Sequence, residues 1–272
     1  MISLLKSLFV LYVFLIPVDC MDTYSFYISF IHITILDILI LLMSGIFILA
    51  LKPTWATPME ITSRNRLDVI IPLVQGKKVL DCGGIDHDNF ALKHQRGLWL
   101  HDLLVQYAAS VLGVDILEDK VKEMNRRGYH FICQNVETLN LPEKFDVVVA
   151  GEIIEHLSNP GLFLQSIKAV LKEDGILILT TPNVHAILRL LQVLLSGEAV
   201  HPEHTCWFSG KTLQQLLRLN GYQVRQLYWC NAEAHHWSIE LFRKLVSRVR
   251  KDLGQTLLII ASPLAGSDAA NG

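Results

Sequence analysis

The sequence predicts an α/β domain with a doubly wound, Rossmann-like sheet, preceded by an apolar N-terminal segment. Short, nearly continuous runs of leucine and β-branched residues are typical of strands that are buried on both faces. These runs alternate with segments of helical periodicity, which is the order of a parallel sheet built from right-handed crossovers. The chain has 272 residues. Beyond its first 51 residues it therefore retains roughly 220, enough to bury a sizeable core.

The predicted elements follow one another in a regular order. A helix ends over residues 67–74, and Gly76 stops it. Strands are predicted at 78–82, 110–116, 130–133, 145–150, 175–181, 223–229 and 255–262. The later helices are predicted at 98–109, 119–127, 160–171, 212–219 and 238–253. The folded domain is therefore expected at 67–264, after a linker at 52–66 and before a disordered tail at 265–272.

Residues 1–51 are predicted to be a membrane anchor with one or two transmembrane helices. The apolar run 26–51 is longer than the roughly 20 residues that a helix needs to cross the hydrocarbon core, and the run 2–18 is marginal. Lys6 interrupts the first run near its start, and Lys52, Arg64 and Arg66 follow the second, which predicts a hairpin with both ends in the cytoplasm. A cleaved signal peptide ending near Cys20 is the alternative, but residues 17–20 match a small-residue cleavage site poorly.

Charge and cysteine content exclude some classes of partner. The formal net charge is -2 and no block of like charges is present, so no nucleic-acid partner is expected. The five cysteines contain no C-x-x-C pair, which argues against a disulfide framework and a structural zinc site. A reducing compartment fits this pattern.

Polar and glycine residues follow the predicted strands at the edge where a doubly wound sheet binds its ligand. After the first strand, Asp81 is followed by two glycines, which let the backbone approach a ligand closely. Asp115 ends the second strand and suits ribose hydroxyls. Asn135 and Glu137 follow the third strand and can reach an adenine edge. Residues 151–157, Gly-Glu-Ile-Ile-Glu-His-Leu, follow the fourth.

Residues 79–84, 113–116, 145–157, 171–177 and 201–209 carry a resemblance to class I S-adenosylmethionine-dependent methyltransferases, in particular bacterial ones found with polysaccharide-biosynthesis enzymes. The resemblance spans residues 67–264 and implies a seven-stranded sheet whose last strand is antiparallel. It implies that Asp81 and the glycine loop hold the methionine part of S-adenosylmethionine, Asp115 the ribose, and Asn135 the adenine. The implied cofactor-binding residues are Asp81, Gly83, Gly84, Asp115, Ile116, Asn135, Val136, Gly151 and Glu152. The first residues also resemble the start of bacterial O-antigen polymerases and ligases.

The glycine loop departs from the family pattern. D-x-G-x-G-x-G would place glycines at positions 85 and 87, where this chain has Ile85 and His87. A long insert at residues 88–99 follows. In this insert and just after it, Trp99 and His101 are candidates to line the cofactor pocket, with core packing of the tryptophan as the alternative.

The cluster Glu152-x-x-Glu155-His156 resembles the metal-binding motif of ubiquinone-type O-methyltransferases and of small-RNA 2'-O-methyltransferases. The resemblance implies Mg²⁺ or Mn²⁺ held by Glu152, Glu155, His156 and His204, with His201 as second choice for the last ligand. Such a metal would orient a substrate hydroxyl and lower its pKa. The alternative is that these glutamates only begin a helix. Without metal, His156 or His204 is the candidate catalytic base.

The predicted function is O-methylation of a sugar or lipid-linked glycan intermediate by a domain that faces the cytoplasm at a bacterial inner membrane. Methylation of a quinone-like lipid is the alternative within the same enzyme class. A catalytically inactive, membrane-bound binding module is the alternative from another class. A nicotinamide-dependent oxidoreductase is disfavoured because G-x-G-x-x-G is missing. The acceptor, which residues 184–208 are expected to select, and the oligomeric state are left open.

Overall fold

The computed structural model describes residues 62–85, 90–198, 200–231, 242–243, 245–246 and 250–264. The predicted membrane anchor at 1–51, the linker as far as residue 61 and the tail at 265–272 lie outside the described residues. Within the described ranges, no helix combines the length and the apolar character needed to cross a membrane.

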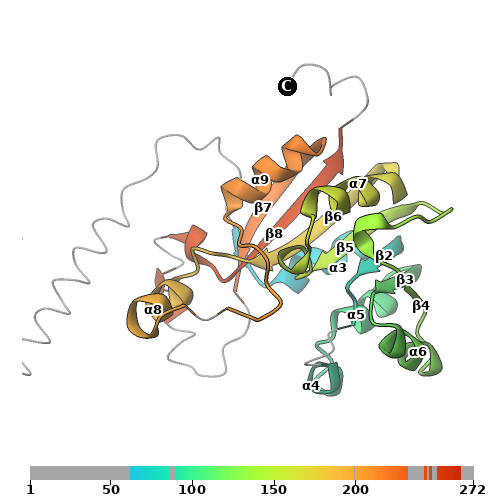
Figure 1. The fold of residues 1–272 in the computed structure, drawn as a ribbon, viewed down its shortest axis with the longest axis horizontal. Helices are drawn as coiled ribbons and strands as arrows, with labels where there is room; N and C mark the ends of the chain where they lie inside the picture. Colours follow the sequence, from blue (N-terminus) through green and yellow to red (C-terminus); the bar gives the residue numbers. More distant parts are fainter. Residues whose placement is uncertain are drawn as a thin grey trace, which may run out of the picture. The chain divides into compact units, whose positions relative to one another are not determined.

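The strands of the described chain form one mixed sheet in the order β1-β7-β8-β6-β5-β2-β3-β4 (Figure 1). The predicted strands are β2 (Lys78–Cys82), β3 (Ser110–Asp115), β4 (Phe131–Cys133), β5 (Phe145–Gly151), β6 (Leu171–Pro182), β7 (Tyr222–Cys230) and β8 (Thr256–Pro263). Strands β4, β3, β2, β5 and β6 pair in parallel, and β8 runs antiparallel to both β6 and β7. The predicted seven-stranded sheet is confirmed, with one short strand, β1 (Thr62–Arg64), added in parallel at the β7 edge.

The described helices are α3 (Arg66–Val74), α4 (Phe90–Gln95), α5 (Leu100–Tyr107), α6 (Glu118–Arg126), α7 (Pro160–Val170), α8 (Ile187–Ser196) and α9 (Gly210–Leu219). Single 3-10 turns lie at η2 (Val136–Thr138), η3 (Ile154–His156) and η4 (Lys251–Leu253). Helices α4 and α8 were not predicted, and the end of the expected linker contains β1. Within the predicted helix at 238–253, residues 242–243 and 245–246 are helical, and the C-terminal end is the turn η4; residues 238–241, 244 and 247–249 lie outside the described residues.

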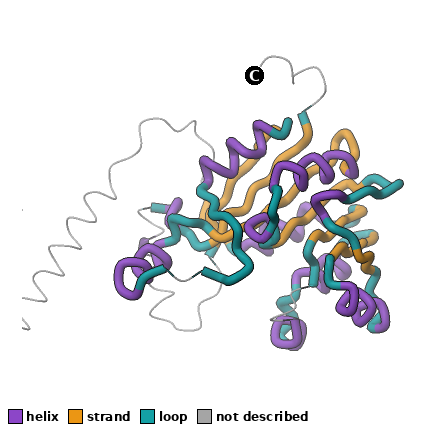
Figure 2. Tube along the Cα trace, in the orientation of Figure 1, coloured by secondary structure: helices purple, strands orange, loops and turns teal. Residues whose placement is uncertain are grey.

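Helices lie on both faces of the sheet (Figures 1 and 2), and an apolar layer of side chains packs on each face. Leu80 and Val148 pack on one face with side chains of α7 and α9. Val79 and Val147 pack on the other with side chains of α3 and α5. Alternate residues of each strand point to opposite faces, so a strand buried on both needs apolar side chains throughout. This is why the strands appear in the sequence as continuous apolar runs.

Local signals fix where the helices begin. The Asn159 side chain accepts a hydrogen bond from the Leu162 amide, and Pro160 occupies the first helical position of α7. Both residues suit these positions, since a helix start leaves free amides and tolerates proline. Ser209 and Thr212 cap α9 reciprocally. Because β2 to β6 are parallel, the loops at their carboxyl ends gather at one edge of the sheet.

Candidate functional site

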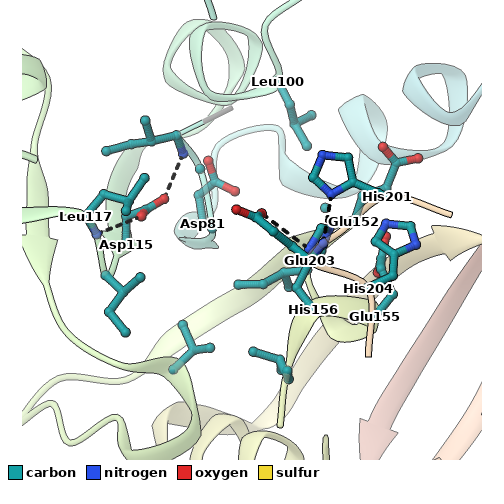
Figure 3. Close-up of a pocket in the computed structure, with 18 of the residues that line it drawn as sticks. Asp81, Leu100, Asp115, Leu117, Glu152, Glu155, His156, His201, Glu203 and His204 are labelled. Carbon is teal, nitrogen blue, oxygen red and sulfur yellow. Dashed lines mark hydrogen bonds and ion pairs between the residues drawn. The ribbon is translucent and has the colours of Figure 1, made fainter. Parts of the chain in front are cut away.

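A cavity of about 630 Å³ opens at the carboxyl ends of the parallel strands (Figure 3). All of the predicted cofactor-binding residues line it, and so do the predicted catalytic and metal-binding residues: Asp81, Gly83, Gly84, Asp115, Ile116, Asn135, Val136, Gly151, Glu152, Glu155, His156 and His204. Figure 3 shows Asp81 and Asp115 toward one side of this cavity and the histidines toward the other. The fold therefore brings together residues that the sequence places on five different loops.

The carboxylate of Asp115, at the end of β3, is held in one orientation. It is 7% exposed, and its two oxygens accept hydrogen bonds from the backbone amides of Ile85 at 3.2 Å and Leu117 at 3.1 Å. A carboxylate has lone pairs for further donors. A rigid acceptor at this place in a doubly wound sheet suits a pair of vicinal hydroxyls.

The two glycines after β2 are required by close contacts. Gly83 has a φ of +68°, and a Cβ there would lie 2.7 Å from the side chain of Ile153. A Cβ on Gly84 would lie 2.5 Å from Oδ2 of Asp81. Asp81 is itself buried and takes a hydrogen bond from Nδ1 of His101 at 2.8 Å. His87 lies outside the described residues.

The adenine side of the predicted site is built on the turn after β4. The side chain of Asn135 accepts a hydrogen bond from the Glu137 amide at 2.9 Å and so caps η2. Val136 is buried, whereas Ile116 is 64% exposed although it lines the cavity. An exposed apolar side chain at a pocket wall is suited to cover a flat, apolar ring.

Glu152, which follows β5, adopts a strained backbone conformation. Its φ is +55°, the one positive value for a non-glycine residue within the described ranges. Its amide donates to the carbonyl of Thr180 at 3.0 Å, and its carboxylate lies 3.3 Å from the guanidinium of Arg66. Such a conformation costs on the order of 1–3 kcal/mol and is typical of functional sites. The pairing with Arg66 was not predicted, because no local pattern links the two segments.

Glu155 is a buried carboxyl group in the cavity wall. It is 1% exposed, and Oε2 accepts a hydrogen bond from the Thr181 hydroxyl at 3.0 Å. Oε1 has no hydrogen-bond partner in the described part of the chain. Burial raises the pKa of this carboxyl to about 7, with a smaller contribution from the charge of Glu152.

Three histidines form a group at the other side of the cavity. One nitrogen from each of His156, His201 and His204 can be chosen so that all lie within 4.8 Å of one another. Of the four ligands predicted, His156 and His204 belong to this group, while Glu152 and Glu155 do not. The second-choice His201 takes a place in it instead. Sequence spacing could not show this, because the loop from 201 to 204 reaches the end of β5 only in the folded chain.

The electrostatics favour neutral imidazoles at two of these histidines, His156 and His204. Burial lowers the pKa of His156, although Glu203, whose carboxylate lies 3.8 Å from Nδ1, acts in the opposite direction. Burial also lowers the pKa of His204, and the neighbouring histidines add to this effect. Neutral imidazoles can accept a proton or bind a metal.

The aromatic residues in and around the cavity have different surroundings. Trp99 lines the cavity and is 1% exposed, so it serves both the pocket and the core. Phe208 is a core residue. Trp207 stacks under the guanidinium of Arg189, 4.0 Å from the ring centroid, and packs edge-on to His204. Trp207 therefore contacts both Arg189 and the histidine group.

The sequence profile of a methyltransferase-domain family matches residues 61–227, more than half of the chain. The chain belongs to the class I S-adenosylmethionine-dependent methyltransferases. The resemblance to this class of methyltransferases is thereby confirmed. The methyltransferase is 32% identical over 170 residues to the mitochondrial ubiquinone biosynthesis O-methyltransferase of Rattus norvegicus. It is 35% identical over 122 residues to the ubiquinone biosynthesis O-methyltransferase of Haemophilus ducreyi.

These matches cover part of each protein. They extend over 56% and 40% of this methyltransferase and over 46% of each relative, so the chain spans about half the length of the relatives it matches. A solved methyltransferase from Archaeoglobus fulgidus aligns with 72% of this chain and 91% of its own, at 19% identity and a TM-score of 0.49. The YcgJ protein of Bacillus subtilis aligns with 74% of this chain and 98% of its own, at 18% identity and a TM-score of 0.48.

Proposed function

We propose that this methyltransferase O-methylates a quinone-like or other lipid-borne hydroxyl group at a membrane surface. The observation that carries the proposal is the group of three histidines, which lies in the same cavity as Asp81 and Asp115. The relatives named as ubiquinone biosynthesis O-methyltransferases favour a quinone-like acceptor over the sugar or lipid-linked glycan that the sequence first suggested. A glycan hydroxyl remains the alternative acceptor.

The proposed placement of the cofactor follows the shape and charge of the cavity. Asp115 would accept the ribose hydroxyls, with the adenine against Ile116 and between Asn135 and Val136. The amino-acid part would lie along Gly83 and Gly84 toward Asp81. The sulfonium would then approach Gly151 and Glu152, on the side where the histidines stand. S-adenosylmethionine supplies the electrophilic methyl group.

In the proposed reaction, an imidazole of His156 or His204 takes the proton from the acceptor hydroxyl as its oxygen attacks the methyl carbon. The carbon–sulfur bond breaks and its electron pair stays on sulfur, which leaves S-adenosylhomocysteine. Holding the two reactants in line can supply several kcal/mol of the barrier. Because the pKa values of both imidazoles are lowered, the base is already neutral at pH 7. Activity should fall as the pH drops below the usual histidine range.

The alternative role of the same nitrogens is to hold a divalent ion. Three imidazoles suit an ion such as Zn²⁺, whereas Mg²⁺ and Mn²⁺ prefer oxygen ligands. The ion would orient the acceptor oxygen. Titration of the full-length chain with Zn²⁺ or Mn²⁺ alone, followed by calorimetry, tests this alternative. Binding that His201→Ala abolishes supports it, and activity that survives chelation favours the base.

Helix α8 supports the proposed membrane location. None of its residues is buried, and Leu194 and Leu195 are 80% and 85% exposed. The helix joins Pro182 to the histidine loop, both of which line the cavity. Apolar side chains that are exposed beside a pocket mark a site for an apolar surface or ligand. We propose that this face meets lipid where the acceptor enters.

A kinetic comparison tests the role of α8. Leu194→Asp with Leu195→Asp should raise KM for a long-chain phenolic acceptor presented in vesicles, while KM for a short, water-soluble analogue stays unchanged. Leu219→Asp is the matched control, because Leu219 is 69% exposed on a different helix, α9. Equal effects on both acceptors would contradict the proposal.

The cofactor assignment is tested first, with the full-length chain purified in mild detergent. We expect S-adenosylmethionine and S-adenosylhomocysteine to bind at micromolar affinity and Asp115→Ala to abolish binding. Radiolabelled S-adenosylmethionine is then offered with phenolic lipids and with lipid-linked sugars. Label in the sugar fraction alone would favour the glycan alternative. Binding without transfer to any acceptor would favour the inactive binding module, and the absence of all binding would refute the enzyme.

A further inference from the structure

The described part of the loop after β2 reaches the first of the two positions where the family pattern has a later glycine. Ile85 stands at the first of these positions, and its side chain is buried in a cluster with Trp99, Met124 and Phe131. Its amide donates to Asp115. The side chain therefore anchors the loop in an apolar cluster where the family pattern has a flexible glycine.

Trp99, at the end of the insert, holds the same loop from the other side. Its indole nitrogen donates a hydrogen bond to the carbonyl of Gly84 at 2.9 Å. The ring is held edge-on by Phe90 and Tyr129, at centroid distances of 4.8 Å and 5.0 Å. A ring locked in this way gives the Gly84 carbonyl a single position.

His101, two residues later, holds Asp81. The two side chains are 0% and 2% exposed, and Nδ1 of His101 lies 2.8 Å from Oδ2 of Asp81. The imidazole is tilted against Phe131, with ring centroids 4.2 Å apart. Nε2 is buried and has no hydrogen-bond partner in the described part of the chain. His101 does not belong to the cavity lining, whereas Asp81 does.

This geometry shows which nitrogen of His101 carries the hydrogen in its bond to Asp81. An ionised carboxylate only accepts hydrogen bonds, so Nδ1 must carry a hydrogen. His101 therefore donates through Nδ1 and orients the Asp81 carboxylate.

We propose that a side-chain brace takes the place of the missing glycine at position 85, in which Trp99 holds the Gly84 carbonyl and His101 aims the Asp81 carboxylate at the ammonium group of the cofactor. His101 is thus a positioning residue that acts through Asp81. The inference rests on the proposed cofactor site. If the brace acts in this way, breaking it should lower the affinity for ligands that have the ammonium group and leave the affinity for ligands that lack this group unchanged.

Two ligands separate this role from simple packing. S-adenosylhomocysteine carries the amino-acid part, and 5'-methylthioadenosine has the same adenosine and thioether without it. Calorimetry on the full-length chain in mild detergent gives both affinities. His101→Leu should weaken S-adenosylhomocysteine by at least about tenfold, the size of one charge-assisted hydrogen bond. The affinity for 5'-methylthioadenosine should stay within about twofold, since that ligand makes no contact that depends on this bond.

Two further substitutions of His101 and one control variant test whether the effect depends on the hydrogen bond to Asp81. His101→Asn keeps a neutral N–H near the place of Nδ1 and should stay within about threefold of the wild type for S-adenosylhomocysteine, because one hydrogen bond is retained. His101→Gln moves the donor and serves if the leucine variant does not fold. Tyr129→Phe is the matched control, since it removes a hydrogen bond to Asp102 in the same aromatic cluster without touching Asp81.

The outcomes are distinct. Selective loss of S-adenosylhomocysteine in the leucine or glutamine variant, with rescue by asparagine, supports the brace. Equal weakening of both ligands, or an asparagine variant as weak as the leucine one, overturns it in favour of packing alone. A wild-type chain that binds neither ligand overturns the cofactor site itself, and with it the brace.

Discussion

Glu155 shows how one buried carboxyl can couple the site to stability. Burial favours its neutral form, so its pKa rises from the usual 4.5 to about 7. Below the unfolded-state pKa, the Glu155 carboxyl is neutral in both the folded and the unfolded state, and the free energy of unfolding has its full value. The part of it that depends on the neutral carboxyl is lost as the pH rises through the folded-state pKa. Between these two values the carboxyl must either ionise without a full set of partners or retain its proton at a growing free-energy penalty.

Glu155→Gln should remove this pH dependence. From pH 5 to pH 8, the free energy of unfolding of the wild type should fall by on the order of 3 kcal/mol more than that of the variant, because a shift of one pKa unit corresponds to about 1.4 kcal/mol. Urea unfolding at both pH values measures the difference. Glu173→Gln, at an exposed position on β6, is the control. An unchanged difference between the two pH values would contradict the prediction.

We expect the strained backbone at Glu152 to lower the free energy of unfolding and its carboxylate to support methyl transfer. Glu152→Gly relieves the left-handed backbone and should leave the free energy of unfolding equal or raise it by up to about 1 kcal/mol, since the half-exposed pair with Arg66 contributes little. Methyl transfer should fall because the carboxylate leaves the cavity. Glu152→Gln separates the two effects, since it keeps the strain and removes the charge. A glycine variant with full activity would show that the carboxylate is dispensable.

At the scale of elements, the contact between β3 and β4 connects the sheet to the cofactor loop. A Cβ on Gly113 would lie 2.2 Å from the ring of Phe131, so only glycine allows the two strands to pair with this ring in place. The same ring packs with Ile85, Trp99 and His101. A displacement of Phe131 therefore reaches the loop that is proposed to hold the cofactor.

Gly113→Ala should destabilise the fold by about 1–3 kcal/mol through overpacking. Phe131→Leu removes the ring that the added methyl group would overlap. The double variant should therefore lose less free energy of unfolding than the sum of the losses in the two single variants. Thermal unfolding of the four chains completes this cycle. Strict additivity would mean that the strain is relieved elsewhere in the sheet.

At the scale of the whole molecule, the cavity depends on loops from both halves of the sheet, so a ligand that fills it should stabilise the domain as a unit. With S-adenosylhomocysteine at about 100 times its Kd, the expected gain is about 2.7 kcal/mol. That gain corresponds to an increase in Tm of roughly 5–10 °C for a domain of this size. Differential scanning fluorimetry measures the shift, and Asp115→Ala should abolish it. A shift retained in that variant would place the ligand elsewhere.

Much of this fold was predictable because its signals are local. The apolar runs and the order of the elements depend on neighbouring residues only, and they predicted the strands and the residues at the carboxyl edge of the sheet, while the antiparallel last strand was implied by the family resemblance. Pairings between distant loops have no such signal. The sequence alone could not show that His201 joins His156 and His204, that Arg66 meets Glu152, or that His101 holds Asp81. These contacts depend on where the crossovers carry each loop, and that is set by packing of the two faces of the sheet.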